Sequence, residues 1–267
     1  MTGAPELVAA GRRRTGEVVA ALQALDDDGL RAPSALPGWS RLTIACHLRY
    51  GAEAFARMTA AAREDRPVSY YPGGREGTRP ATLEPSAGEA PADVVASLAE
   101  HSTALDGAWR SMAPAGWELV VREPDDRPDL GPLPVGRLPL LRLTEVEVHG
   151  SDLDLGLGDW SEVFVRAALP FRLQWLNTRR TNHRGVDASV QGSWLLTAPD
   201  GPRWLVAVAD GRVLSRPAAR RIGADAVIEA PARDLLALLL GRPLRSEPRY
   251  DGDAALGRAF SRAFPGP

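Results

Sequence analysis

Apolar positions recur with helical spacing in four stretches of the first 155 or so residues. The first stretch covers residues 5–25, where a proline lies near the first turn and the apolar residues fall on one face. The second follows Ser40, a residue type that caps helix N-termini, and it predicts a helix to about residue 63. The apolar face of the first stretch consists of Leu7, Val8, Val18, Leu22 and Leu25.

Two further helices follow the same pattern. Pro91 opens the third, because proline is tolerated in the first turn of a helix, and the fourth covers residues 138–154. The stretches 64–90 and 113–134 are rich in proline and lack periodicity, so they predict long loops. The pattern therefore predicts an all-α four-helix bundle over residues 1–158. The apolar face of the third helix consists of Val94, Leu98, Leu105 and Trp109.

The pattern changes after residue 158 and predicts an α+β domain with an antiparallel sheet over residues 159–267. Ser161 opens one more helix, which we expect to reach about Arg180 and to bend or break near Pro170. Pro231 opens a last helix, and Gly241 lies where a C-terminal cap belongs. Strand-like segments separated by tight-turn sequences lie between these helices, at 188–198, 203–209, 212–216 and 226–229.

The fourth helix carries two polar side chains on an apolar stripe. Glu145 and His149 are four residues apart, so they lie one turn apart on one helix face. A carboxylate and an imidazole are costly there unless something compensates them. A divalent metal ion would do so, because it binds both groups as ligands. The same face also carries Leu138, Leu141, Val148 and Asp152.

His47 is the candidate third ligand, because it lies beside the apolar face of the second helix. Facing helices that project polar groups inward build metal sites in helix bundles. A Glu/His pair at this spacing also occurs by chance, and an isolated histidine is more often a hydrogen-bonded core residue, so a metal-free bundle remains an alternative. His101 is a less favoured ligand.

Composition and charge exclude several classes of function. The 267 residues carry 44% hydrophobic and 25% charged residues with a formal net charge of -2, which argues against nucleic-acid or anionic-membrane partners. The longest aliphatic run, residues 235–240, is too short to span a bilayer. Cys46 is the single cysteine, so no disulfide forms within the chain and we expect a cytoplasmic protein. Neighbouring helix positions diverge, so Cys46 is interpreted as a core thiol and not as a partner of His47 on one metal.

Three segments resemble the mycothiol-dependent maleylpyruvate isomerase family, within the wider group of DinB-like metal-binding bundles. They are L-P-G-W-S-R-L-T-I-A-C-H-L at 36–48, R-L-T-E-V-E-V-H-G-S-D-L-D-L-G at 142–156, and a late segment at 224–242 that resembles a C-terminal sterol-carrier-like domain. The resemblance implies a zinc ion on His47, Glu145 and His149, the same residues that spacing singles out.

The resemblance also implies a chemistry. Mycothiol, as a thiolate, would add to the cis double bond of a maleylpyruvate-like substrate, and elimination after rotation would give the trans isomer; S-transfer to an electrophile would use the same site. Arg242 is the residue we carry over for the arginine of the sterol-carrier-like portion. Arg142 and Arg49 are further candidates for binding substrate carboxylates.

Two alternatives stay open. The bundle could be a metal-stabilised binding or carrier module without catalysis, or a zinc-dependent hydrolase, for which Asp152 is the nearest candidate general base. The expected partners are a small-molecule substrate and a low-molecular-weight thiol. The sequence leaves the substrate, the metal beyond a divalent ion, and the choice between monomer and homodimer open.

Overall fold

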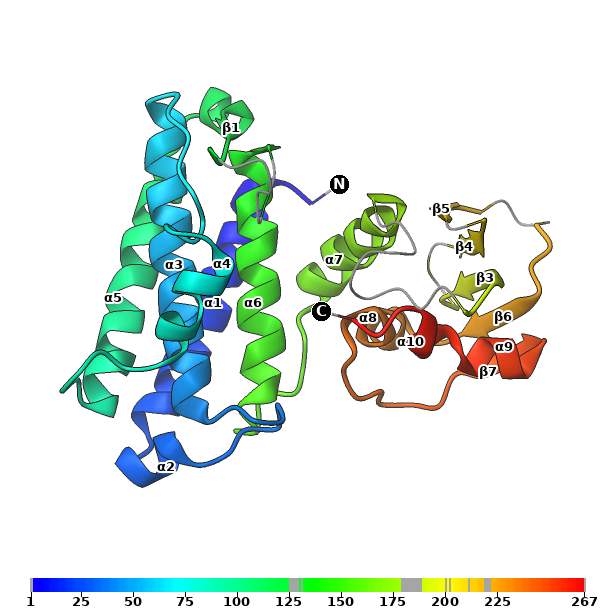
Figure 1. The fold of residues 1–267 in the computed structure, drawn as a ribbon, viewed down its shortest axis with the longest axis horizontal. Helices are drawn as coiled ribbons and strands as arrows, with labels where there is room; N and C mark the ends of the chain where they lie inside the picture. Colours follow the sequence, from blue (N-terminus) through cyan, green and yellow to red (C-terminus); the bar gives the residue numbers. More distant parts are fainter. Residues whose placement is uncertain are drawn as a thin grey trace. The chain divides into compact units, whose positions relative to one another are not determined.

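The computed structural model describes residues 2–124, 130, 132–178, 189–199, 201, 203–210, 212–218 and 222–266. The chain separates into two compact units, residues 1–164 and residues 165–267. Figure 1 shows the helices of the first unit and the sheet of the second.

The first unit is a four-helix bundle, as the sequence predicts. Its long helices are α1 (Ala4–Gln23), α3 (Arg41–Arg63), α5 (Pro91–Arg110) and α6 (Leu138–Asp152), and a short α2 (Asp27–Arg31) lies between the first two. Both α1 and α3 pack against α5 and against α6 (Figure 1). The two pairs α1/α5 and α3/α6 therefore form different faces of the bundle.

Local chemistry sets the helix boundaries. The Ser40 hydroxyl accepts a hydrogen bond from the Thr43 amide at 3.0 Å, which caps α3 as predicted. Proline occupies the first turn of α1, of α5 and of α6. The two predicted loops contain short elements that periodicity is too weak to reveal: α4 (Arg75–Thr78), η1 (Pro80–Leu83), η2 (Pro114–Glu118), the antiparallel pair β1 (Val120–Val121) and β2 (Leu133–Pro134), and η3 (Val135–Arg137).

The bundle core includes buried charges beside its apolar side chains. Leu22, Ile44 and Leu98 are fully buried. Glu147 points away from the Glu145 face, and it is buried against α1, where its carboxylate lies 3.2 Å from the Arg14 guanidinium. It also accepts hydrogen bonds from the amide and hydroxyl of Ser161. The charge pair thus ties α6 to α1 and to the chain beyond it.

The second unit contains a five-stranded sheet in the order β5-β4-β3-β6-β7. Helix α7 (Glu162–Trp175) leads into it and continues through Pro170 to η4 (Leu176–Thr178); the predicted end near residue 180 lies outside the described residues. The strands are β3 (Gly192–Thr197), β4 (Arg203–Ala209), β5 (Arg212–Pro217), β6 (Ala226–Glu229) and β7 (Arg249–Gly252).

The prediction of an antiparallel sheet is wrong for one strand pair. Strand β6 pairs with β3 in parallel, with Trp194 opposite Ala226, while the other neighbours pair antiparallel. The sheet is mixed because β6 pairs with the edge of β3 that β4 does not occupy, and β6 runs in the same direction as β3. Strand β7 is also missing from the sequence prediction, because its side chains are mostly exposed and carry no apolar alternation.

Helix α8 (Ala232–Leu240) follows β6 and ends as predicted. Gly241 takes the left-handed conformation with φ 63°, and the main chain of Pro265 leaves no room for a Cβ there. The short helices α9 (Ala254–Arg258) and α10 (Phe260–Ala263) are the last two helices of the described chain, and Phe260 packs on the buried Trp194. No helix among the described residues is long and apolar enough to cross a membrane.

Replacing Glu147 with alanine should lower the free energy of unfolding by about 3–5 kcal/mol, because Arg14 would lose its buried carboxylate and keep only the half-exposed Glu17 as an acidic partner. Urea unfolding followed by circular dichroism measures the loss. Glu17→Ala is the matched control: Glu17 pairs with the same arginine at 3.0 Å but is 48% exposed, and exposed pairs contribute about 0–1 kcal/mol. Equal losses in the two variants would contradict this account.

Candidate metal centre

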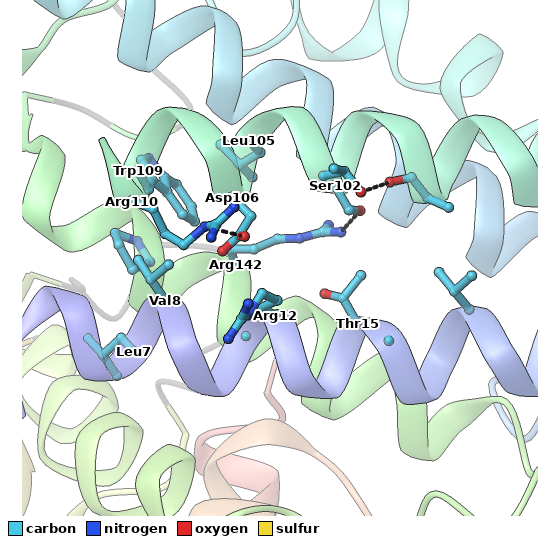
Figure 2. A pocket seen from close by; sticks show the side chains of 16 residues that line it. Leu7, Val8, Arg12, Thr15, Ser102, Leu105, Asp106, Trp109, Arg110 and Arg142 are labelled. Carbon is cyan, nitrogen blue, oxygen red and sulfur yellow. Dashed lines mark hydrogen bonds and ion pairs between the residues drawn. The ribbon is translucent and has the colours of Figure 1, made fainter. Parts of the chain in front are cut away.

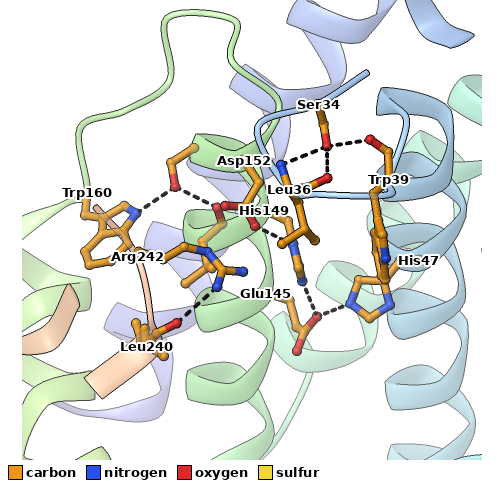
Figure 3. Close-up of polar contacts among 12 residues, drawn as sticks. Ser34, Leu36, Trp39, His47, Glu145, His149, Asp152, Trp160, Leu240 and Arg242 are labelled. Atoms are coloured by element: carbon orange, nitrogen blue, oxygen red, sulfur yellow. Dashed lines mark hydrogen bonds and ion pairs between the residues drawn. The ribbon is translucent and has the colours of Figure 1, made fainter. Parts of the chain in front are cut away.

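Three potential metal ligands meet between α3 and α6. His47 comes from α3, and Glu145 and His149 come from successive turns of α6 (Figure 3). Oε2 of Glu145 lies 2.5 Å from Nε2 of His47 and 3.7 Å from Nε2 of His149. One ligand atom from each residue lies within 4.8 Å of the others, and this is the only such group of three or more in the described chain. The structure therefore brings together the residues that the sequence singles out.

Asp152 orients His149. Its Oδ2 lies 2.9 Å from Nδ1 of His149, and the carboxylate side chain is 6% exposed (Figure 3). An ionised carboxylate can only accept a hydrogen bond, so Nδ1 of His149 carries the proton. Nε2 of His149 then keeps its lone pair, which points toward Glu145 and His47. A carboxylate on the second nitrogen of a metal-binding histidine fixes the ring and raises its basicity. The Asp152 carboxylate thus binds the His149 ring, whereas the hydrolase alternative would need this carboxylate as a general base.

Burial and neighbouring charges set the protonation of the group. Burial raises the pKa of Glu145, but His47, His149 and Arg142 together bring it to about 2. Burial lowers the pKa of His47 from its ordinary value, although Glu145 opposes the change. The group therefore holds an ionised carboxylate and a neutral His47 imidazole at neutral pH, which are the forms that a divalent ion binds. This donor set fits a divalent metal.

Trp39 and Arg79 lie beside the two histidines. The Trp39 ring stacks on His149, with ring centroids 5.8 Å apart and an interplanar angle of 9°, and meets His47 edge-on at 5.5 Å. The Ser34 hydroxyl donates to the Trp39 carbonyl at 2.8 Å and holds the turn before α3. The Arg79 guanidinium lies 5.7 Å from the Trp39 ring centroid, within cation–π range.

Arg79 is a residue that the sequence prediction missed. It lies in the loop predicted at 64–90, and only the length of that loop pointed to a functional role. Its guanidinium forms no hydrogen bond with any residue in the described part of the chain. A cation held only by an aromatic face is suited to pair with an anionic ligand.

The single cysteine lies outside this group. Cys46 is fully buried on α3, and burial raises the pKa of its thiol to about 11. The thiol therefore stays protonated at neutral pH. This agrees with the prediction of a core thiol.

The other candidate residues lie in different surroundings. Arg142 is buried and donates to the Leu48 carbonyl at 2.7 Å; burial lowers its pKa to about 10, so it stays cationic. Arg49 pairs with Glu89 at 2.5 Å and lines a separate polar pocket together with His101. Arg242 belongs to the second unit, where it donates to the Leu240 carbonyl at 3.0 Å. The substrate roles of Arg142, Arg49 and Arg242 stay predictions.

Replacing Asp152 with asparagine should weaken metal binding about 10- to 100-fold, because the amide holds the His149 ring less firmly and withdraws the carboxylate charge. Competition with a chromophoric chelator measures the dissociation constant. Asp154→Asn is the control, since Asp154 is exposed two residues further along. An unchanged dissociation constant in the Asp152 variant would remove the orienting role.

The chain is similar to proteins of one family in both sequence and fold. Residues 11–154, more than half of the chain, match the family model described as mycothiol maleylpyruvate isomerase N-terminal domain. The crystal structure of the mycothiol-dependent maleylpyruvate isomerase superposes with a TM-score of 0.68 at 19% identity, covering 93% of this chain and 92% of that chain. The structure of a histidine-to-alanine mutant of that enzyme gives 0.69 with the same identity and coverage. A comparison with curated protein sequences finds no match.

Proposed function

Because the chain belongs to the mycothiol maleylpyruvate isomerase N-terminal domain family, we propose that it is a metal-dependent enzyme that uses a low-molecular-weight thiol, mycothiol, as nucleophile. The proposed reaction is cis–trans isomerisation of a maleylpyruvate-like substrate or S-transfer to an electrophile. The single observation that carries the proposal is the convergence of His47, Glu145 and His149 around one position, where Glu145 is ionised and burial lowers the pKa of His47. Zinc is the proposed metal.

The three residues would hold the ion from two helices. Three protein ligands leave a position for an exogenous ligand, which is typical of catalytic rather than structural zinc sites. A divalent ion bound here would stabilise the thiolate form of an incoming thiol at neutral pH. His47 and His149 would each bind the ion through a ring nitrogen, Glu145 would contribute the negative charge, and Asp152 keeps the His149 ring in place. The buried Cys46 takes no part.

Residues around the group would position the substrate. The Trp39 ring covers His149 and excludes water from that side of the ligand ring. Arg79 would pair with a substrate carboxylate, since its guanidinium lies over the same indole. Arg142 is a further proposed carboxylate-binding residue of the bundle, and the substrate role of Arg242 is proposed from the family resemblance alone.

Cobalt substitution tests the proposal directly. The cobalt-loaded protein should develop a thiolate-to-metal charge-transfer band when mycothiol is added, and none before. Metal without a band would reject the thiol-using enzyme, and absence of metal would leave only the binding-module alternative.

His149→Ala should lose both metal and activity, because it removes one of three ligands. Metal analysis after gel filtration and a thiol-dependent isomerase assay measure the two effects. Cys46→Ser is the control and should keep the metal, the band and the activity, since its thiol is buried and protonated. Stoichiometric metal in the His149 variant would overturn the ligand assignment.

Arg79→Gln should raise KM for a carboxylate-bearing substrate about 10- to 100-fold, the loss expected for one charged hydrogen bond, with a smaller effect on kcat. Steady-state kinetics at saturating mycothiol measures both constants. Arg75→Gln is the control, because Arg75 lies over the Tyr71 ring instead. A variant with unchanged KM would exclude Arg79 from substrate binding.

A further inference from the structure

A second pocket lies on the face of the bundle formed by α1 and α5 (Figure 2). Its volume is about 360 Å³, at the small end of the range for small-molecule sites. The helix α6 contributes only Pro139 and Arg142 to its wall. His47, Glu145 and His149 are not among the described residues that line it, because they face the groove between α3 and α6. The pocket is therefore separate from the metal centre.

Two glycines line this pocket. Gly11 and Gly16 lie inside α1, where glycine is less favourable than alanine. A Cβ added at either position would meet no atom within 4 Å. Gly16 is exposed, but Gly11 is buried, so the open space beside Gly11 belongs to the pocket.

The lining is apolar but carries net positive charge. Leu105 and Trp109 form apolar wall on α5. Asp106 and Arg110 offset each other as an ion pair at 2.9 Å. The wall then keeps two further cations: Arg12 of α1, and Arg142 of α6, whose charge also acts on Glu145 outside the pocket (Figure 2).

Both cations have donors to offer. Arg142 is 3% exposed, and it uses its guanidinium for one bond to the Leu48 carbonyl and one to the Ser102 hydroxyl at 3.0 Å. A guanidinium carries further N–H donors beyond these two. Arg12 forms no ion pair or hydrogen bond through its guanidinium with the part of the chain that the structure describes. A carboxylate would satisfy donors from both residues.

We propose that this pocket binds a small monocarboxylate with an apolar body, such as a medium-chain fatty acid. The carboxylate accepts hydrogen bonds from Arg12 and Arg142. The apolar body packs against Leu105 and Trp109 and fills the space beside Gly11. This site goes beyond the proposed enzyme function and does not depend on it.

Isothermal titration calorimetry with octanoate tests the site, with octanol as the uncharged probe of the same length. Octanoate should bind at least about tenfold more tightly than octanol, because a charged hydrogen bond is lost in the alcohol. Arg12→Gln should weaken octanoate binding about tenfold, while Arg13→Gln, at a neighbouring exposed arginine that does not line the pocket, should leave it unchanged. Gly11→Leu should abolish binding by filling the pocket.

Three results would overturn the proposal. They are no detectable octanoate binding, equal affinity for octanoate and octanol, and equal effects of the Arg12 and Arg13 substitutions. Titration of the His149→Ala variant separates the two sites. Octanoate binding that persists there supports a separate pocket, and binding that disappears would place the ligand at the metal centre.

Discussion

The negative charge of Glu145, held between α3 and α6, is the constraint on which the metal centre depends. A carboxylate inside a helix bundle is unfavourable unless cations and hydrogen-bond donors surround it. His47 lies 2.5 Å away and donates a hydrogen bond, and the cation Arg142 lies on the same helix; with His149 they bring the pKa of Glu145 to about 2, although desolvation acts in the opposite direction. The same requirement brings α3 and α6 together at the position where metal ligands are needed. The contacts among His47, Glu145 and His149 thus help to fix the position of α3 relative to α6.

Arg142 extends this arrangement through the centre of the bundle. It is contributed by α6, and its guanidinium donates to a carbonyl of α3 and a hydroxyl of α5. Leu48, whose carbonyl it binds, directly follows His47. One buried cation therefore helps to position residues on three helices. Its loss would disturb the metal ligands without touching any of them.

The features that could be predicted from the sequence depend on residues close together in the chain. Helix periodicity, the Ser40 cap and the αL glycine at 241 are local, and so is the one-turn spacing of Glu145 and His149. His47 could be proposed from its residue type, its place beside an apolar face and the family resemblance of the segment that contains it. The parallel pairing of β6 with β3, the Arg14–Glu147 pair and the position of Arg79 depend on contacts between distant segments, and no local pattern encodes them.

The two faces of the bundle share Arg142, and this has a thermodynamic consequence. Arg142 precedes Glu145 by three residues on α6, stabilises its negative charge, and also lines the pocket between α1 and α5. A carboxylate bound in that pocket would partly neutralise the Arg142 guanidinium. Arg142 would then stabilise the negative charge of Glu145 less. A metal ion that neutralises Glu145 would therefore strengthen carboxylate binding. Coupling between two sites is reciprocal, so the bound carboxylate would strengthen metal binding by the same factor. Because the two sites meet only through this buried residue, the sign of that coupling follows from electrostatics without any movement of the helices.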